Sequence, residues 1–152
     1  MLHERLPRLL DDTIRPILRR PAALQVAALC LRDGPGGQQV LLITSRGTGR
    51  WILPKGWPMP RRSLAEAAAQ EAWEEAGVRG HIDEAEFGRY RAIKEVAGGV
   101  PVPCEVVVFR LPVDGVADDF PEAAQRERRW LKPADAATLV REDGLRALLS
   151  GL

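Results

Sequence analysis

Residues 51–78, WILPKGWPMPRRSLAEAAAQEAWEEAGV, carry the clearest structural signal in the chain. Ser63 is a good helix N-cap, and Glu66 stands three residues later, which completes a capping box. Gly77 stands where a left-handed C-cap is expected, after an alanine-rich segment. Together these signals predict a helix over residues 64–76, preceded by a loop rich in proline and glycine.

Glu71, Glu74 and Glu75 are spaced so that they share one face of this predicted helix. Like charges at this spacing destabilise a helix, each pair by about 0.2–0.5 kcal/mol. The glutamates also lie in the C-terminal half of the helix, where the helix dipole disfavours negative charge. A bound divalent cation would compensate both effects, and carboxylates, water and phosphate oxygens are a typical magnesium environment.

The alternative interpretation of this pattern is an acidic helix face exposed to solvent, which an E-x-x-E-E pattern on its own would favour. The surrounding sequence favours a metal site instead. A glycine-containing loop before the helix lets the backbone approach a phosphate group closely. Cationic side chains that would suit a metal-bridged polyphosphate gather near that loop: Arg46, Arg50, Lys55, Arg61 and Arg62.

Residues 56–78 resemble the Nudix box, G-x5-E-x7-R-E-U-x-E-E-x-G-U, in which U is a bulky apolar residue, and the register has no gap. The preceding residues 51–57, WILPKGW, resemble the subgroup that acts on diphosphoinositol polyphosphates and dinucleoside polyphosphates. The order of predicted elements on either side extends the resemblance to most of residues 22–140.

This resemblance implies hydrolysis of a phosphoanhydride bond in a nucleoside diphosphate-X or polyphosphate substrate, with Mg²⁺ or Mn²⁺ as the cofactor. It implies that Glu74 and Glu75 bind the metal, and that Glu71 either binds the metal or orients the attacking water. The backbone carbonyl of Lys55 is a further candidate ligand. The candidate substrate-binding side chains are those of Lys55, Arg50 and Arg62.

Two positions depart from the box, because Arg62 replaces its first glutamate and Gln70 replaces its arginine. Ala72 is a milder departure, since a bulkier apolar residue is usual there. The box arginine normally helps to orient the neighbouring carboxylates, so its absence is expected to loosen their geometry, and Gln70→Arg is expected to raise the rate. The departures leave open a Nudix-fold binding or regulatory module with little activity. A third hypothesis is an unrelated α/β protein with a solvated acidic helix.

The general base of this family varies in position and often lies outside the box. Glu105 is one candidate, because it is an acid within an apolar, strand-like run. The alternative for Glu105 is a strand-edge position that faces solvent. Glu127 and Glu95 are weaker candidates for the same role.

The whole chain predicts an α/β protein: a single-domain, Nudix-like α/β/α sandwich whose mixed sheet is covered by helices on both sides. The domain is expected over residues 21–152, and residues 1–20 are expected to form an N-terminal arm or short helix. Strands are predicted over residues 22–32, 39–44, 86–93, 102–113 and 128–131, and further helices over residues 133–140 and 143–149.

The formal net charge of +1 over 152 residues gives no strong field that would attract nucleic acid or a membrane surface. Neither nucleic acid as a stable partner nor a membrane is therefore expected. The resemblance implies a small-molecule phosphate substrate as the partner, and the chain is expected to be a monomer or a homodimer. The N-terminal residues lack a long apolar run, so a cytoplasmic location is expected. Cys30 and Cys104 lie in apolar runs and are predicted to be buried free thiols.

Overall fold

The computed structural model describes residues 22–95 and 99–152, so the expected N-terminal arm lies outside the described residues. Three helices are described: α2 (Leu64–Ala76), α3 (Pro133–Leu139) and α4 (Asp143–Ser150). The described strands are β1 (Ala23–Gly34), β2 (Gly37–Thr44), β3 (Trp51–Ile52), β4 (Lys55–Gly56), β5 (Val78–Gly80), β6 (Glu86–Lys94), β7 (Val102–Val116) and β8 (Arg128–Leu131).

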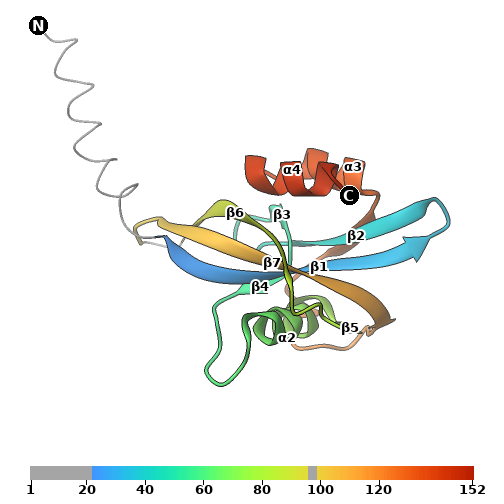
Figure 1. The fold of residues 1–152 in the computed structure, drawn as a ribbon, viewed down its shortest axis with the longest axis horizontal. Helices are drawn as coiled ribbons and strands as arrows, with labels where there is room; N and C mark the ends of the chain where they lie inside the picture. Colours follow the sequence, from blue (N-terminus) through green and yellow to red (C-terminus); the bar gives the residue numbers. More distant parts are fainter. Residues whose placement is uncertain (1–21, 96–98) are drawn as a thin grey trace, which may run out of the picture.

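The strands form one mixed sheet around a central parallel pair, β1 and β7 (Figure 1). On the side of β1, β2 pairs antiparallel with β1, and β3 and β8 pair antiparallel with β2. On the side of β7, β5 and β6 both pair antiparallel with β7. The two-residue strand β4 pairs antiparallel with β1 through Val26 and Ala27, so the loop that leads to α2 starts at the sheet.

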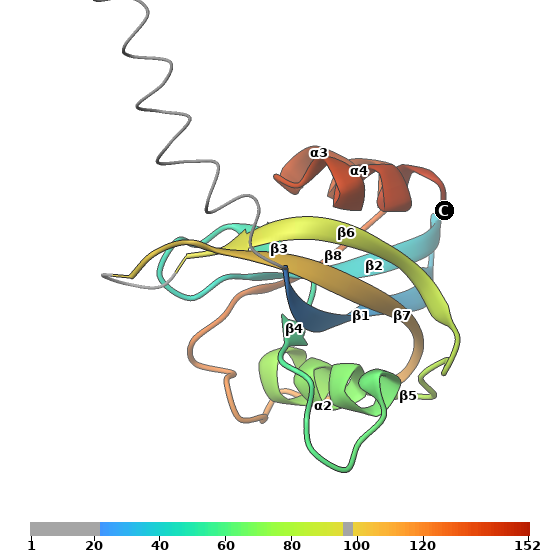
Figure 2. The same ribbon diagram turned by 60° about the vertical axis from the view of Figure 1, so that its left-hand side comes forward.

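Helices cover both faces of this sheet. Figure 2 shows α2 beneath one face and α3 and α4 above the other. The mixed sheet and its two helical layers confirm the predicted α/β/α sandwich. Because β1 and β7 are covered on both faces, their sequences are apolar at successive positions instead of alternating with polar residues.

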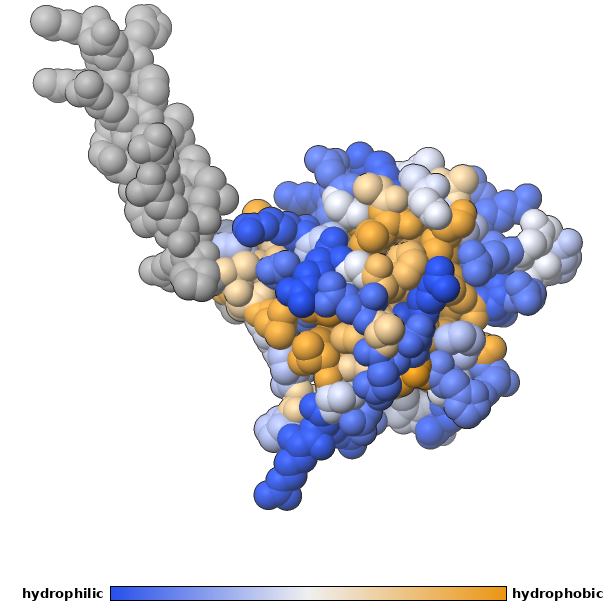
Figure 3. Space-filling model, in the orientation of Figure 1, coloured by the Kyte–Doolittle hydropathy of each residue, from blue (hydrophilic) through white to orange (hydrophobic). Residues whose placement is uncertain are grey.

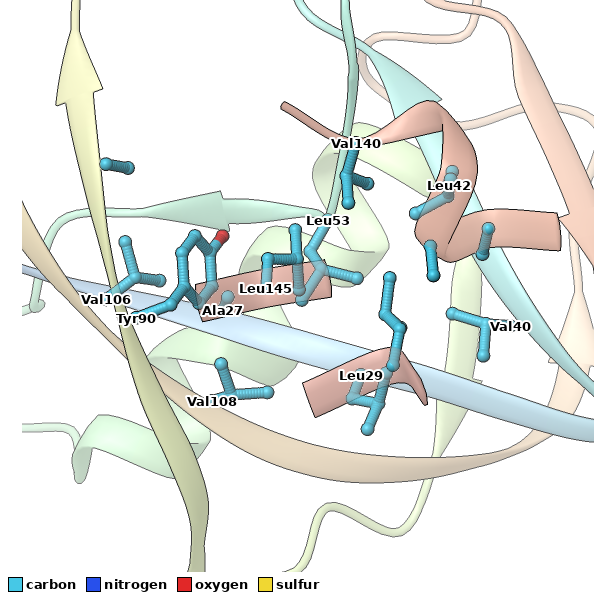
Figure 4. Close-up of a cluster of buried hydrophobic side chains, with 14 of the residues drawn as sticks. Ala27, Leu29, Val40, Leu42, Leu53, Tyr90, Val106, Val108, Val140 and Leu145 are labelled. Carbon is cyan, nitrogen blue, oxygen red and sulfur yellow. The ribbon is translucent and has the colours of Figure 1, made fainter. Parts of the chain in front are cut away.

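The core is divided between the two faces of the sheet by the alternation of side chains along each strand. Ala27, Leu29 and Leu31 point toward α3 and α4, and the close-up in Figure 4 shows this half of the core with Leu145 of α4 packed over the strands. The intervening residues Val26, Ala28 and Cys30 belong to the half that packs on α2.

Between its two helical layers, one side of the molecule has hydrophobic side chains at the surface. In Figure 3, hydrophobic side chains gather across the middle of the visible face, between α4 and α2, and hydrophilic side chains surround them. Among the described helices, none combines the length and the apolar character that crossing a membrane requires.

Most predicted elements agree with the structure to within a few residues. The predicted helix over residues 64–76 has the bounds of α2, and both cysteines are buried free thiols as predicted. The short strands β3, β4 and β5 were not predicted, because two or three residues carry no periodic pattern. β7 continues to Val116, beyond the predicted end at residue 113, because its last residues pair with β5.

The ends of α2 are fixed by the predicted caps. The Ser63 side chain accepts a hydrogen bond from the Glu66 N–H at 3.0 Å, and the Glu66 carboxylate accepts one from the Ser63 N–H at 3.0 Å. Gly77 ends the helix in the left-handed region at φ 67°, and its N–H donates to the Trp73 carbonyl at 2.9 Å. The caps at both ends therefore fix where α2 begins and ends, and with it which residues form its acidic face.

We predict that Gly77→Ala destabilises the protein. A non-glycine residue in the left-handed region costs about 1–2 kcal/mol, and the added methyl group would collide with the ring of Phe120. The free energy of unfolding, measured by urea denaturation, should fall by at least about 2 kcal/mol. Gly115→Ala is the control, because a methyl group there meets open space. Equal stabilities of the two variants would contradict this assignment.

Candidate metal and phosphate site on α2

An alanine-rich face of α2 packs on the sheet and brings the acidic face close to β4. Ala65, Ala67, Ala68, Ala72 and Ala76 are buried in this packing. Their small side chains let the helix approach the sheet closely. Ala72 therefore belongs to the buried face of α2 and is not part of the acidic face.

Glu71 lies against the backbone of Gly56. A β-carbon at position 56 would overlap the Glu71 carboxylate, so only glycine leaves room for this approach. The neighbouring residue Lys55 donates its backbone N–H to Glu75 Oε1 at 2.9 Å. Two glutamates of α2 thus meet the backbone of β4, and the approach of Glu71 explains why a glycine stands at position 56.

Glu75 is the most buried of the three glutamates, with 5% of its surface exposed. Arg126, which lies just before β8, places Nη2 2.6 Å from Glu75 Oε2 and 3.3 Å from Glu122 Oε1. Arg126 also donates from Nη1 to the Thr44 carbonyl at 3.0 Å. Sequence reasoning missed Arg126, because 51 positions separate it from Glu75 and no local pattern marks it.

Glu74 is held by the two residues that depart from the Nudix box. Gln70 Nε2 donates to Glu74 Oε1 at 2.8 Å, and Arg62 Nη1 donates to Gln70 Oε1 at 3.2 Å. The two departures are therefore in direct contact with each other. Gln70 accepts from the cation on one side and donates to the carboxylate on the other, a role that an amide side chain can fill.

The electrostatics of the acidic face favour a bound cation. Burial, followed by the negative charges of Glu75 and Glu74, raises the pKa of Glu71 to about 7. Burial also raises the pKa of Glu75 to about 7, although Arg126 and the Lys55 N–H act in the opposite direction. A divalent cation between these carboxylates would restore their charged forms, so the donor set fits magnesium or manganese.

In the part of the chain that the structure describes, no three acidic, histidine or cysteine side chains converge closely enough to hold a metal ion as they stand. The reason is visible in the partners of the box glutamates. Glu74 binds Gln70, and Glu75 binds Arg126 and the Lys55 N–H. Metal binding at this face would thus require the side chains of Glu74 and Glu75 to exchange at least part of these contacts.

A cavity of about 150 Å³ opens beside Glu75. Its wall holds cationic side chains that the sequence predicted to bind substrate and others that it did not. Lys55 and Arg50, which the sequence analysis selected, lie on its wall together with Arg126. The Lys55 Nζ donates to the buried Gln25 side chain at 2.8 Å, and burial lowers the pKa of Lys55. Arg50 pairs with Glu142 at 3.4 Å.

Unpaired polar atoms gather at the same cavity. Among the described residues, three buried side-chain atoms lack a hydrogen-bond partner: Arg50 Nε, Arg126 Nε and Glu142 Oε2. All three residues line the cavity beside Glu75. Buried polar groups are nearly always paired in proteins, so this concentration of unpaired atoms points to a ligand or to ordered water in the cavity.

The remaining candidates lie in different places. Arg62 lines a separate cavity with Gln70 and Trp73, so the structure does not bring it to the wall beside Glu75. Glu105 pairs with Arg89 at 3.6 Å and is 39% exposed. Glu127 is exposed next to β8. Of the three general-base candidates, Glu95 is the one that lines the cavity with Glu75, and it pairs with Arg141 at 3.3 Å.

We predict a pH-dependent stabilisation by magnesium. The ordinary pKa of a glutamate is 4.5, and those of folded Glu71 and Glu75 are about 7, so between these values the folded chain holds more protons than the unfolded chain. Stability without metal should therefore fall as the pH rises from 4.5 to about 7. Since magnesium binds the deprotonated carboxylates, its effect on Tm should be small near about pH 5.5 and large near about pH 8.

Thermal unfolding with excess chelator and with magnesium at both pH values checks this prediction. Glu71→Gln, which removes one of the two titrating carboxylates, should reduce the difference between the two pH values. A magnesium effect on Tm that is equal at both pH values, or absent at both, would contradict the assignment of these glutamates.

A sequence model of the NUDIX domain matches residues 23–149. The chain is 34% identical to Nudix hydrolase 12, mitochondrial, of Arabidopsis thaliana, an alignment that covers 73% of this chain and 56% of the relative. It is 30% identical to diphosphoinositol polyphosphate phosphohydrolase 2 of Rattus norvegicus, which covers 76% of this chain and 62% of the relative.

Among solved structures, the Ap4A hydrolase of C. elegans superposes with a TM-score of 0.59 at 21% identity, over 86% of this chain and 95% of that chain. This likeness shows the shared fold. The alignments with the Arabidopsis and rat relatives each span less than two thirds of the relative's own length. The family match covers nearly all of the described residues, and it confirms the resemblance that residues 56–78 carry. The chain therefore belongs to the Nudix family.

Proposed function

We propose that this chain is a metal-dependent hydrolase that cleaves a phosphoanhydride bond in a nucleoside diphosphate-X or polyphosphate substrate. The observation that carries the proposal is the pairing of two features. Glu71 and Glu75, whose pKa values are raised to about 7, sit on one helix face, and a cavity lined by cations opens beside Glu75. Carboxylates for a metal and cations for phosphates are the two requirements of phosphoryl chemistry.

The proposed roles follow from position. Glu71, Glu74 and Glu75, with the backbone carbonyl of Lys55, would hold Mg²⁺ or Mn²⁺, as the Nudix box implies. The metal would supply charge stabilisation to the phosphate oxygens as the bond to the leaving group breaks. Lys55 would also have a second role, in which the ammonium group of its side chain contacts the phosphates.

The cavity walls would orient the phosphates. Arg50 and Arg126 both line the cavity, and each has an unpaired buried Nε that could donate to a phosphate oxygen. We favour Glu95 over Glu105 and Glu127 as the general base, since Glu95 lines this cavity. Arg62 is better explained as a positioning residue for Glu74 through Gln70 than as a phosphate ligand.

The names of the relatives support this substrate range without fixing it. The relatives include proteins named for diphosphoinositol polyphosphates, and a structural neighbour is named for Ap4A. A cytoplasmic location stays a prediction, because the Arabidopsis relative is named as mitochondrial. A monomer or a homodimer stays a prediction as well.

The experiment that tests the proposal is product release from a panel of polyphosphates. The panel holds diadenosine tetraphosphate, a nucleoside triphosphate, a nucleotide sugar and a diphosphoinositol, each with magnesium and with excess chelator. Turnover of at least one substrate that the chelator abolishes is the expected result. Metal binding without turnover of any substrate would favour the second candidate, a binding or regulatory module, which the departures at Arg62 and Gln70 motivate.

We predict that Glu74→Gln removes metal-dependent turnover and leaves the fold intact. Glu74 is partly exposed, and its carboxylate accepts a hydrogen bond from an amide, so the glutamine variant loses a charge without leaving a buried cation unpaired. Loss of a metal ligand should lower kcat by about a hundredfold or more. Glu66→Gln, on the same helix but in the capping box, is the control for activity. Wild-type turnover by Glu74→Gln would show that the metal site is elsewhere.

A further prediction concerns the contact between Arg62 and Gln70. Gln70→Arg alone would place a second guanidinium against Arg62, so we now expect no gain in rate from that single change. The double variant Arg62→Glu/Gln70→Arg puts the glutamate and the arginine of the box at two positions that are in contact, and it should raise kcat by up to about tenfold. Arg61→Glu/Gln70→Arg has the same net charge and serves as the control. If the control gains as much as the double variant, the contact between positions 62 and 70 is irrelevant to the rate.

A further inference from the structure

A cavity of about 280 Å³ lies between α2 and β5. None of the described residues lines both this cavity and the cavity beside Glu75, so the two are separate. One side of α2 forms its wall, through residues three or four positions apart: Glu66, Ala69, Gln70 and Trp73. Small-molecule sites in proteins have volumes of about 300–1,000 Å³, so this cavity is close to the size that takes a small organic ligand.

Part of the wall is apolar and well packed. Val78 of β5 and Leu111 of β7 are each 1% exposed, and Ile82, just after β5, is partly buried against the same core. Trp73 is half-buried on the same wall. An inorganic ion would leave this apolar surface in contact with water, whereas the carbon skeleton of an organic ligand would cover it.

Two arginines bring positive charge to the cavity. The guanidinium group of Arg79 lies over the ring of Trp73, with Cζ 3.9 Å from the ring centroid. Arg62 donates from Nη1 to the Gln70 amide oxygen at 3.2 Å, which uses one of its five N–H donors. Among the described residues, neither arginine forms an ion pair, so both guanidinium groups can bind an anion.

One carboxylate, that of Glu66, also lines the cavity. It accepts a hydrogen bond from the Ser63 N–H at 3.0 Å, which commits one of its oxygens to the cap of α2. Glu84 accepts a hydrogen bond from the Ser63 hydroxyl at 3.1 Å and does not line the cavity. The charges of Arg62 and Arg79 therefore exceed the single negative charge on the wall.

We propose that this cavity binds a small organic phosphate monoester, at a site separate from the acidic face of α2. Arg62 and Arg79 would donate to the phosphate oxygens, and the organic group would lie against Trp73 and Ile82. A phosphate monoester carries a charge of about −1.5 to −2 at pH 7, which suits two guanidinium groups. Arg62 would keep its contact with Gln70 through Nη1 and bind the phosphate with its other donors.

Calorimetry with phenyl phosphate, inorganic phosphate and phenol tests the inference. The protein is first freed of metal with a chelator, which is then removed by dialysis, so that no metal on α2 can bind the probes. Phenyl phosphate should bind about tenfold more tightly than inorganic phosphate, because its ring covers the apolar wall. Phenol, which lacks the charge, should show no saturable binding. Arg79→Gln should weaken the binding of phenyl phosphate by about tenfold or more.

Arg110→Gln is the matched control for Arg79→Gln. Arg110 is also exposed and also lies over an aromatic ring, that of Phe87, with Cζ 4.7 Å from the ring centroid. It does not line the cavity. Both variants lose one positive charge, so a general effect of net charge would appear in both. Thermal unfolding of the two variants shows whether either change has disturbed the fold.

The fluorescence of Trp73 gives a second readout, which reports the place of binding. Because Arg79 lies over this indole ring, a phosphate that binds Arg79 should change the tryptophan emission. Trp73→Phe keeps an aromatic ring in the wall. This variant should therefore still bind phenyl phosphate in calorimetry and should lose the change in emission.

Several outcomes would overturn the inference. They are the absence of saturable phenyl phosphate binding to the wild type, and inorganic phosphate binding that is as tight as that of phenyl phosphate. Equal losses in Arg79→Gln and Arg110→Gln, or no loss in Arg79→Gln, would place the ligand elsewhere. A change in emission that persists in Trp73→Phe would do the same. None of these measurements uses turnover, so the result is independent of the proposed function.

Discussion

The burial of carboxylates on one face of α2, together with the repulsion from nearby negative charges, is the constraint on which the site depends. Glu71 and Glu75 are buried enough, and close enough to other negative charges, that their pKa values rise to about 7. Neighbouring groups partly offset this cost: Arg126 and the Lys55 N–H act on Glu75, and Gln70 binds Glu74. The caps of α2 and its alanine face hold these carboxylates in place against their mutual repulsion.

The fold then turns this local constraint into a groove. β4 ties the loop before α2 to β1, which brings Lys55 and Gly56 under the acidic face. Arg126 reaches the same place from the segment before β8, and Arg50 from the segment before β3. Elements that are distant in the sequence therefore surround one cavity with cations.

How much of this could be read from the sequence depended on how local each signal was. The caps of α2 and the shared face of Glu71, Glu74 and Glu75 are encoded within 15 residues, from Ser63 to Gly77, and the helix was predicted with its observed bounds. Arg126 and Glu142 reach the site only through tertiary packing, so no spacing in the chain marked them. The phosphate contact of Arg62 stays a prediction. Its place in the box suggested contact with phosphate, but its position on the helix entry places it against Gln70.

The most direct test of this account is the position of the metal itself. Crystals grown with Mn²⁺ and a non-hydrolysable polyphosphate would locate the ion by anomalous diffraction. The account predicts Mn²⁺ bound to carboxylates of α2, among Glu71, Glu74 and Glu75, with phosphate oxygens completing its coordination toward Lys55 and Arg126. Mn²⁺ bound elsewhere, or polyphosphate bound away from the acidic face of α2, would contradict the account.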